Sequence, residues 1–127
     1  MPIAKSQEMY TIIDIESNGA GFRKESVIEV AIYKHNGHEI VDQFISLVNP
    51  QSEITPFVQK LTKISPNMVK TAPKFHEIAK RIVEITEGTT LVGHNIDFDY
   101  RMLRQEFQRL GYDFKINTID TIPLAKK

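Results

Sequence analysis

Hydrophobic positions cluster in three short runs within the first 48 residues of the chain. Residues 9–16 (MYTIIDIE) and 27–34 (VIEVAIYK) are rich in β-branched and aromatic side chains, and a loosely alternating run covers residues 39–48. Runs of this length between turn-forming clusters are typical of β-strands. The Asn36-Gly37 dipeptide favours a two-residue hairpin turn. We therefore predict three strands, of which the second and third pair antiparallel.

The pattern changes to helical spacing after residue 49. Thr55-Pro56, Ser65-Pro66 and Ala72-Pro73 each resemble a helix start, in which proline occupies the first helical position. Apolar residues then recur every three or four positions in two segments, which predicts two amphipathic helices. The first segment contains Phe75, Ile78, Ala79, Ile82 and Val83, and the second contains Phe98, Met102, Leu103, Phe107 and Leu110. A short buried strand is expected at residues 89–92 and an edge strand at 114–116.

Three mostly antiparallel strands followed by helix, strand, helix and edge strand describe a mixed α/β sheet with packed helices. A chain of 127 residues suits one domain, which we assign to residues 9–127 after a loose segment, 1–8. The sequence has no cysteine and no apolar run long enough to cross a membrane. We expect a cytoplasmic protein without a disulfide or a membrane span.

Charge sets a limit on how the protein could hold nucleic acid. Sixteen basic and sixteen acidic side chains give a formal net charge of zero. A global positive field is therefore not available to attract a polyanion. Bound cations and a local basic rim would have to supply the attraction.

The first candidate for chemistry is the pair of acids that ends the first predicted strand. Side chains alternate across a strand, so Asp14 and Glu16 share one face while Ile15 points to the other. Two carboxylates on one face repel each other and lose hydration, which a hard cation such as Mg²⁺ or Mn²⁺ would offset. From the spacing alone, an equally good interpretation is that the strand ends at Ile13 and both acids are solvated.

The second candidate is the segment 93–99 (GHNIDFD), where a predicted strand meets a helix. Such junctions place polar side chains and free N–H groups at the end of a sheet. Asp97 and Asp99 lie on opposite sides of a helix, and we assign Asp97 to the helix dipole. Asn95 is predicted as the N-cap, and His94 as a hydrogen-bonding residue rather than a metal ligand.

Taken together, the two motifs resemble the DEDD (DnaQ-like) 3′-to-5′ exonuclease superfamily, which includes the proofreading epsilon subunit of bacterial DNA polymerase III and ribonuclease T. Residues 14–19 (DIESNG) are similar to the first motif, Asp-x-Glu-Thr-Thr-Gly. Residues 94–99 (HNIDFD) are similar to the second, His-Asn-x-x-Phe-Asp. Residues 60–64 (KLTKI) and 120–125 (DTIPLA) extend the resemblance over nearly the whole chain.

The resemblance implies a ribonuclease H-like fold and metal-dependent hydrolysis of phosphodiester bonds at nucleic-acid 3′ ends, in DNA proofreading or processing. It implies that Asp14, Glu16 and Asp99 are three of four acids that hold two Mg²⁺ or Mn²⁺ ions. It also implies contacts with the 3′-terminal nucleotide from Ile15, Ser17, Asn18, His94 and Phe98. We expect DNA in preference to RNA, with a polymerase or a fused nuclease domain as a possible partner.

The chain also departs from the family pattern. Lys63 replaces a usual glycine, and the sequence reaches Lys127 without the third motif, which carries a His or Tyr and the fourth Asp. Asp120 matches the segment before that motif. We therefore expect a C-terminally truncated domain, with weak metal binding and little hydrolysis if these residues are the whole protein. The alternative hypothesis is a non-catalytic module that binds nucleic acid or a polymerase or nuclease partner.

Overall fold

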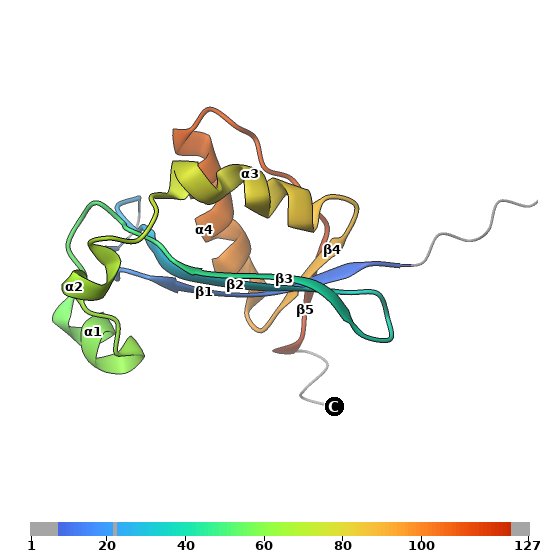
Figure 1. Cartoon of the computed structure of the whole chain (residues 1–127), viewed down its shortest axis with the longest axis horizontal. Helices are drawn as coiled ribbons and strands as arrows, with labels where there is room; N and C mark the ends of the chain where they lie inside the picture. The colour runs from blue at the N-terminus through green and yellow to red at the C-terminus, as the bar shows by residue number, and fades with distance from the viewer. Residues whose placement is uncertain (1–7, 22, 123–127) are drawn as a thin grey trace, which may run out of the picture.

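The computed structural model describes residues 8–21 and 23–122, which form one sheet with packed helices (Figure 1). The predicted loose segment 1–8 lies outside the described residues except for Glu8, and so do residues 123–125 of the segment 120–125 that extends the family resemblance. The elements in chain order are β1 (Tyr10–Ser17), β2 (Val27–His35), β3 (Ile40–Leu47), α1 (Pro56–Thr62), α2 (Pro66–Val69), α3 (Phe75–Thr86), β4 (Thr90–Gly93), α4 (Ile96–Arg109) and β5 (Thr118–Asp120).

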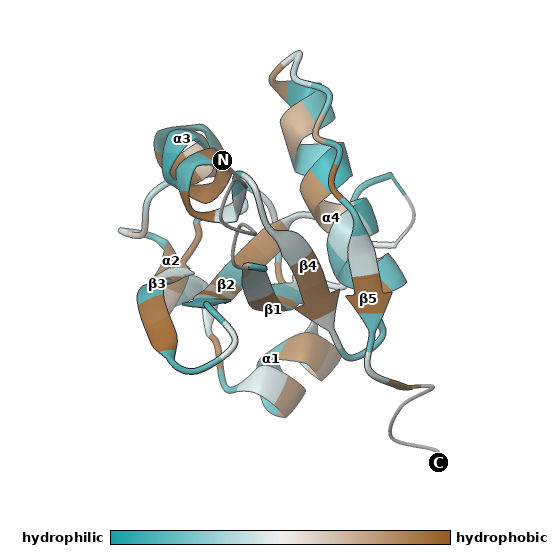
Figure 2. Ribbon diagram, turned by 90° about the vertical axis from the view of Figure 1, so that its right-hand side faces the viewer, coloured by the Kyte–Doolittle hydropathy of each residue, from teal (hydrophilic) through white to brown (hydrophobic). Residues whose placement is uncertain are grey.

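The sheet has five strands in the order β3-β2-β1-β4-β5. Strands β1, β2 and β3 pair antiparallel, whereas β4 pairs parallel with both β1 and β5. Helices α3 and α4 cover one face of this sheet, and α1 lies on the other side (Figure 2). The predicted mixed α/β fold, with antiparallel strands followed by parallel ones, is confirmed.

The main core fills the space between the sheet and helices α3 and α4. Alternate residues of β1, Ile13 and Ile15, enter this core, whereas Ile12 and Asp14 are exposed and Glu16 is half-buried. The alternation confirms that the two acids of β1 share the face opposite the core. The other large side chains that are fully enclosed include Ile32, Ile82, Leu91, Met102, Leu103 and Phe107.

A bulge at the end of the β1–β2 ladder separates this core from a smaller one. Glu16 pairs with Glu29, but Ser17 pairs with Val27, so Ile28 is the extra residue. Val27 and Ile28 then enter different clusters, although they are adjacent in the chain. Ile28 joins a second core beneath α1 and α2. A bulge re-aims neighbouring side chains in this way.

Two of the predicted helix starts are confirmed and one is displaced. Thr55 and Ser65 cap α1 and α2 with their side chains, and a proline follows each of them. Helix α3 begins at Phe75 with Lys74 as its N-cap, not at Pro73. The carbonyl of Pro73 instead accepts a hydrogen bond from the Asn49 N–H at 2.8 Å, so this residue belongs to an extended connection.

Two predicted details of the strands are wrong. The β2–β3 hairpin leaves four residues, 36–39, between its strands. The Asn36 N–H donates to the Glu39 carbonyl at 3.1 Å, and Asn36 Oδ1 accepts from the N–H groups of His38 and Glu39, at 2.8 and 2.9 Å. The edge strand is β5, at residues 118–120, rather than 114–116. Phe114 is buried and stacks on Phe107 with ring centroids 4.8 Å apart, which takes that segment away from the edge of the sheet.

Candidate functional site

Strand β1 brings Asp14 and Glu16 to the sheet face that lies opposite the main core. Asp14 is exposed, whereas Glu16 is half-buried at the end of the strand. Burial raises the pKa of Glu16, and the charges of Asp14 and Glu29 raise it further. These acids therefore form a concentration of like charge rather than an ion pair.

Helix α4 places Asp99 beside the same strand. Its side chain is almost fully buried, with the residue 3% exposed. The pKa of Asp99 is raised to about 7, first by burial and next by the charge of Asp14. The charges of Glu16 and Asp120 raise it further, whereas a hydrogen bond from the Ile15 N–H lowers it. The described structure thus turns Asp99 toward the two acids of β1.

Gly93 permits this approach at the junction of β4 and α4. A Cβ atom at this position would lie 2.9 Å from Ile96 Cδ1 and 3.2 Å from both Asp99 Oδ2 and the Ile13 carbonyl oxygen. The end of the Ile96 side chain would have to move, and the 3.2 Å contacts with Asp99 and the Ile13 carbonyl are tighter than most Cβ contacts in proteins. A glycine therefore lets the first turn of α4 rest against β1 without displacing these neighbours.

Asp120 organises the junction, a role that the sequence did not suggest. Its carboxylate accepts hydrogen bonds from the N–H groups of Ile122 at 2.9 Å and Asn95 at 3.1 Å. These bonds, led by the one from Ile122, lower the pKa of Asp120 despite partial burial. Strands β4 and β5 are parallel neighbours, so their carboxyl ends meet at one edge of the sheet. That topology was the signal that could have identified Asp120.

Asn95 occupies the predicted N-cap position, but for a different reason. Its side chain makes no capping hydrogen bond, and its backbone has φ 62° and ψ 52°. Asparagine tolerates this left-handed conformation better than most residues. The exposed Asp97 lies in the first turn of α4, where the helix dipole favours an acid.

Residues predicted to contact a nucleotide fall into an accessible group and an enclosed group. His94 is exposed, with Nδ1 3.2 Å from Thr121 Oγ1. Ser17 and Phe98 are half-buried, and the guanidinium of Arg101 lies 5.5 Å from the Phe98 ring centroid. Ile15 is only 4% exposed and packs in the main core, so only its backbone faces the acids.

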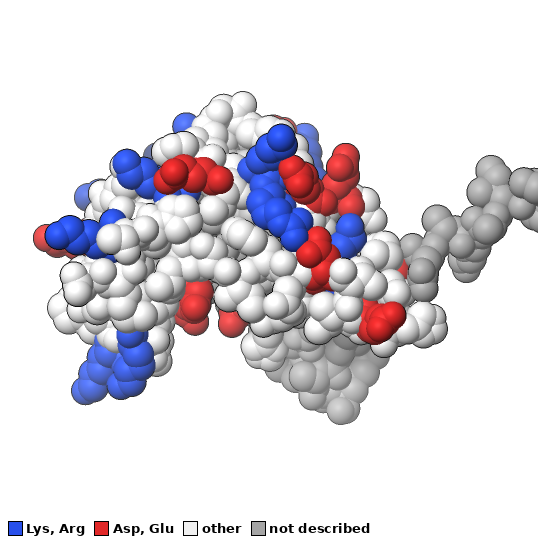
Figure 3. Space-filling model, in the orientation of Figure 1, with Lys and Arg blue, Asp and Glu red and all other residues white. Residues whose placement is uncertain are grey.

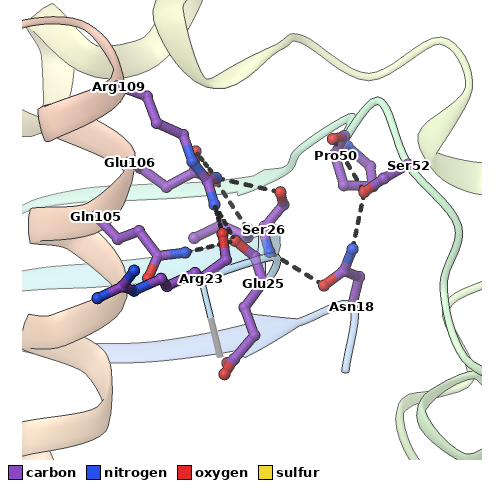
Figure 4. Close-up of polar contacts among 10 residues, drawn as sticks. Asn18, Arg23, Glu25, Ser26, Pro50, Ser52, Gln105, Glu106 and Arg109 are labelled. Carbon is purple, nitrogen blue, oxygen red and sulfur yellow. Dashed lines mark hydrogen bonds and ion pairs between the residues drawn. The ribbon is translucent and has the colours of Figure 1, made fainter. Parts of the chain in front are cut away.

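Asn18 is enclosed as well, and its amide is fully engaged (Figure 4). The amide nitrogen donates to Ser52 Oγ at 2.8 Å and to the Glu53 carbonyl at 3.1 Å. The amide oxygen accepts from the N–H groups of Ala20 and Ser26, at 3.2 and 3.0 Å. Two donors and two acceptor sites are all that an asparagine side chain offers. The Asn18 side chain therefore shapes the β1–β2 loop and has no capacity left for a nucleotide.

A groove of about 790 Å³ runs along the outer side of α4, beside the acids rather than over them. It is lined by Arg23, Asp97, Tyr100, Arg101, Arg104, Gln105, Gln108 and Arg109. Three of its arginines, at positions 101, 104 and 109, each form an ion pair, at 3.1–3.5 Å. Lysine, arginine and acidic side chains are interspersed over the face shown in Figure 3. This distribution agrees with the neutral net charge.

The side chains of Asp14, Glu16 and Asp99 are not arranged as a complete metal-binding site in the described structure. Within the part of the chain that the structure describes, no group of three or more His, Cys, Asp or Glu side chains is arranged to enclose a metal ion. The same residues include no helix that is long and apolar enough to cross a membrane. The charges of Asp14 and Glu16 both raise the pKa of Asp99, and the charge of Asp14 also raises the pKa of Glu16. Carboxylates are suitable ligands for Mg²⁺ or Mn²⁺.

The mixed sheet and the acids at the junction of β1 and α4 define an α/β domain of the ribonuclease H-like class. The sequence profile of the exonuclease family matches residues 11–127. The chain belongs to that family. This assignment agrees with the resemblance seen in the two sequence motifs.

Similar proteins carry this domain within longer chains. The chain is 34% identical over 117 residues to the "DNA polymerase III PolC-type" of Caldanaerobacter subterraneus subsp. tengcongensis, with 92% of this chain and 8% of that protein covered. It is 33% identical over 118 residues to the "3'-5' exonuclease DinG" of Staphylococcus haemolyticus, with 92% and 13% covered. The chain thus spans about a tenth of the length of these relatives.

Solved structures of exonuclease I share the fold. The structure with the inhibitor BCBP superposes with a TM-score of 0.85 at 18% sequence identity, covering 96% of this chain and 30% of that one. The E. coli enzyme in complex with a 5cy-dA13 oligonucleotide gives a TM-score of 0.84, also at 18% identity, with 94% and 29% covered. At this identity the likeness establishes the architecture.

Proposed function

We propose that this domain supplies the acidic part of a metal-dependent 3′-to-5′ exonuclease site, which hydrolyses the terminal phosphodiester bond of a nucleic acid. The observation that carries the proposal is Asp99, a buried acid turned toward Asp14 and Glu16, with its pKa raised to about 7 by burial and by the charge of Asp14. Its described surroundings include other acids and a backbone N–H, but no ion-paired base.

The donor set fits hard divalent cations. Asp14, Glu16 and Asp99 present carboxylate oxygens and no sulfur, which suits Mg²⁺ or Mn²⁺. When bound, such cations would make a water molecule more acidic and would stabilise the departing 3′ oxygen. The three acids would hold the cations, and Asp14, as the exposed member, would remain reachable by the phosphate.

We propose that the rim of the acidic cluster receives the 3′-terminal nucleotide. His94 and Ser17 offer polar groups with exposed or half-buried side chains, and Phe98 offers an aromatic edge at the start of α4. Ile15 would act through its backbone, because its side chain is in the core. Asn18 would act indirectly, by fixing the conformation of the loop that follows Ser17.

DNA is the substrate that we favour. One relative is described as a DNA polymerase III and another as a 3'-5' exonuclease. Because these relatives are much longer, a polymerase or another nuclease domain acting together with this segment is part of the proposal. Cleavage of an RNA strand as fast as a DNA strand of the same sequence would contradict this preference.

The test measures cation binding and cleavage on the same protein. We expect calorimetric titration with Mn²⁺ to show binding that Asp14→Asn removes. A version of the domain extended through a third motif, incubated with Mn²⁺ and a 5′-labelled single-stranded oligodeoxynucleotide, should shorten the strand from its 3′ end; residues 1–127 alone should do so weakly. Asp42→Asn is the control, because Asp42 is a half-buried acid of strand β3 whose side chain forms an ion pair with Arg81 at 2.8 Å. Equal cleavage by the unsubstituted protein and Asp14→Asn would refute the proposal.

The alternative is a non-catalytic module that binds nucleic acid or a polymerase or nuclease partner. One observation favours it: the described acids do not already form a three-ligand cage. The same calorimetric titration separates the two functions. A module without chemistry would bind the oligonucleotide without Mn²⁺, and Asp14→Asn would leave that binding unchanged.

A further inference from the structure

Helix α4 rests on the β1–β2 hairpin through two buried carboxylates, Asp99 and Glu106. They are seven residues apart, which is two helical turns, so both lie on the face that meets the sheet. The two residues are 3% and 7% exposed. Each accepts a backbone hydrogen bond from the hairpin: Asp99 from Ile15 in β1, and Glu106 from Val27 in β2 at 2.9 Å. The helix is therefore attached to both strands of the hairpin.

The attachment at Glu106 is reinforced by its neighbours (Figure 4). Arg109 Nη1 donates to Glu106 Oε1 at 3.1 Å and to Ser26 Oγ at 3.3 Å. Arg109 Nη2 donates to the carbonyl oxygens of Arg23 and Glu25, at 3.2 and 2.8 Å. These contacts clamp the β1–β2 loop to the last two turns of α4. They need no cation.

The clamp acts at the end of the ladder that carries the acids. Val27 of β2 pairs with Ser17 of β1. The bulge lies at the step from Glu16 to Ser17 along β1. A bulge leaves one residue without a ladder partner and bends the strand. The hydrogen bond from the Val27 N–H to Glu106 therefore fixes the point at which the register changes.

We infer that Glu106, together with Arg109, is a positioning residue for the acidic site: it sets the height and rotation of α4 so that Asp99 meets Asp14 and Glu16. This inference rests on the proposed function. Mutual repulsion among the three acids opposes their approach as long as no cation is bound. A second attachment, two turns away and satisfied within the protein, offsets that repulsion.

The first test is Mn²⁺ affinity in Glu106→Gln and Glu106→Ala, measured by calorimetry. Glutamine keeps an acceptor for the Val27 N–H but loses the charge that pairs with Arg109, so its effect should be the smaller of the two. We expect affinity to fall by about 10-fold in Glu106→Gln, in the range known for groups that orient metal ligands. Ile82→Val is the control, since it lowers stability in the core under α3 without touching the clamp. Unchanged affinity in both Glu106 variants would overturn the inference.

The second test needs no metal and separates this inference from the proposed function. Amide hydrogen exchange at Ile15, which faces Asp99, should become faster in Glu106→Gln relative to exchange at Ile32 in the centre of β2. Ile82→Val should change both amides alike. Equal acceleration at Ile15 and Ile32 in Glu106→Gln would mean a merely structural role. If the unsubstituted protein binds no Mn²⁺, the proposed function fails, while the exchange experiment still decides whether Glu106 positions Asp99.

Discussion

The two ends of α4 hold buried acids in opposite electrostatic surroundings. Burial raises the pKa of Glu106, but the Val27 N–H and Arg109 lower it in return. Burial also raises the pKa of Asp99, and there the neighbouring charges of Asp14, Glu16 and Asp120 add to the rise. Glu106 is an acid whose partners are within the protein. Asp99 is an acid whose surroundings favour an external cation.

This difference separates a structural acid from a candidate metal ligand better than burial does. Both side chains are enclosed, both lie on the same helix face and both accept a backbone hydrogen bond. An unpaired buried charge is costly, and proteins keep it where a ligand or a reaction uses it. The accumulation of like charge at Asp99 therefore carries the functional argument.

The largest expected effect is that of Asp99→Asn on cation binding. Asparagine preserves shape and an acceptor for the Ile15 N–H, but it removes the charge. We expect Mn²⁺-dependent cleavage to fall on the order of 10³-fold, since a metal site contributes several kcal/mol to catalysis. Glu106→Gln should reduce Mn²⁺ affinity by only about 10-fold. Calorimetry and the oligonucleotide assay measure both, and equal losses would remove the distinction between the two ends of the helix.

The second effect is the pH dependence of stability without metal. The folded protein raises the pKa of Asp99 from 3.8 to about 7, so between these values it binds a proton that the unfolded chain has lost. The contribution of Asp99 to the free energy of unfolding is therefore greatest below about pH 4 and falls as pH rises through 7, by up to roughly 4 kcal/mol.

Urea unfolding over this pH range measures that effect. Asp99→Asn should flatten the fall, and Glu106→Gln should flatten it less, because partners already lower the pKa of Glu106. Mn²⁺ should restore stability to the unsubstituted protein near pH 7. An identical pH profile in Asp99→Asn would show that Asp99 does not carry the repulsion.

Much of the fold followed from the sequence because its signals are local. Period-two runs identified β1 and β2, and Thr55-Pro56 and Ser65-Pro66 marked two helix starts. The family resemblance led us to expect glycine at position 63, and the φ of 64° at Lys63 is a left-handed conformation that glycine adopts without strain. The position of β5 could not be read in this way, because the packing of Phe114 against Phe107 decides it.

The site was predicted less completely than the fold. Alternation placed Asp14 and Glu16 on one face, and helical geometry distinguished Asp97 from Asp99. Asp120 and Glu106 were missed, because each accepts a hydrogen bond from a backbone N–H that is distant in the chain. The enclosure of Asn18 depends on a loop more than thirty residues away. Such contacts follow from tertiary structure and have no local pattern.

Gly93→Ala should have an intermediate effect on stability and on Mn²⁺ affinity. The disturbance should be confined to the end of α4 that carries Asp99. The added Cβ would press on Ile96 Cδ1, Asp99 Oδ2 and the Ile13 carbonyl, so stability should fall by about 1–3 kcal/mol, as in other overpacked sites. Mn²⁺ affinity should fall as well, because Asp99 is displaced.

Gly88→Ala is the control for this substitution. Gly88 has a φ of 74° and open space around a Cβ atom, so the alanine should lower stability by about 1 kcal/mol through backbone strain. Its Mn²⁺ affinity should match that of the unsubstituted protein.

The smallest effect is expected from Asp97→Asn, which makes the sharpest comparison with Asp99→Asn. Both acids lie in the first turn of α4 and both substitutions remove one negative charge, but Asp97 is exposed and Asp99 is buried beside β1. Losing the favourable interaction with the helix dipole should cost about 0.3–1 kcal/mol in urea unfolding. Mn²⁺ affinity should change by less than about 2-fold, since an exposed charge on the far side of the turn is screened by solvent. A fall equal to that of Asp99→Asn would mean that the cation is attracted by the net charge of the turn and that the geometry of the buried acid is irrelevant.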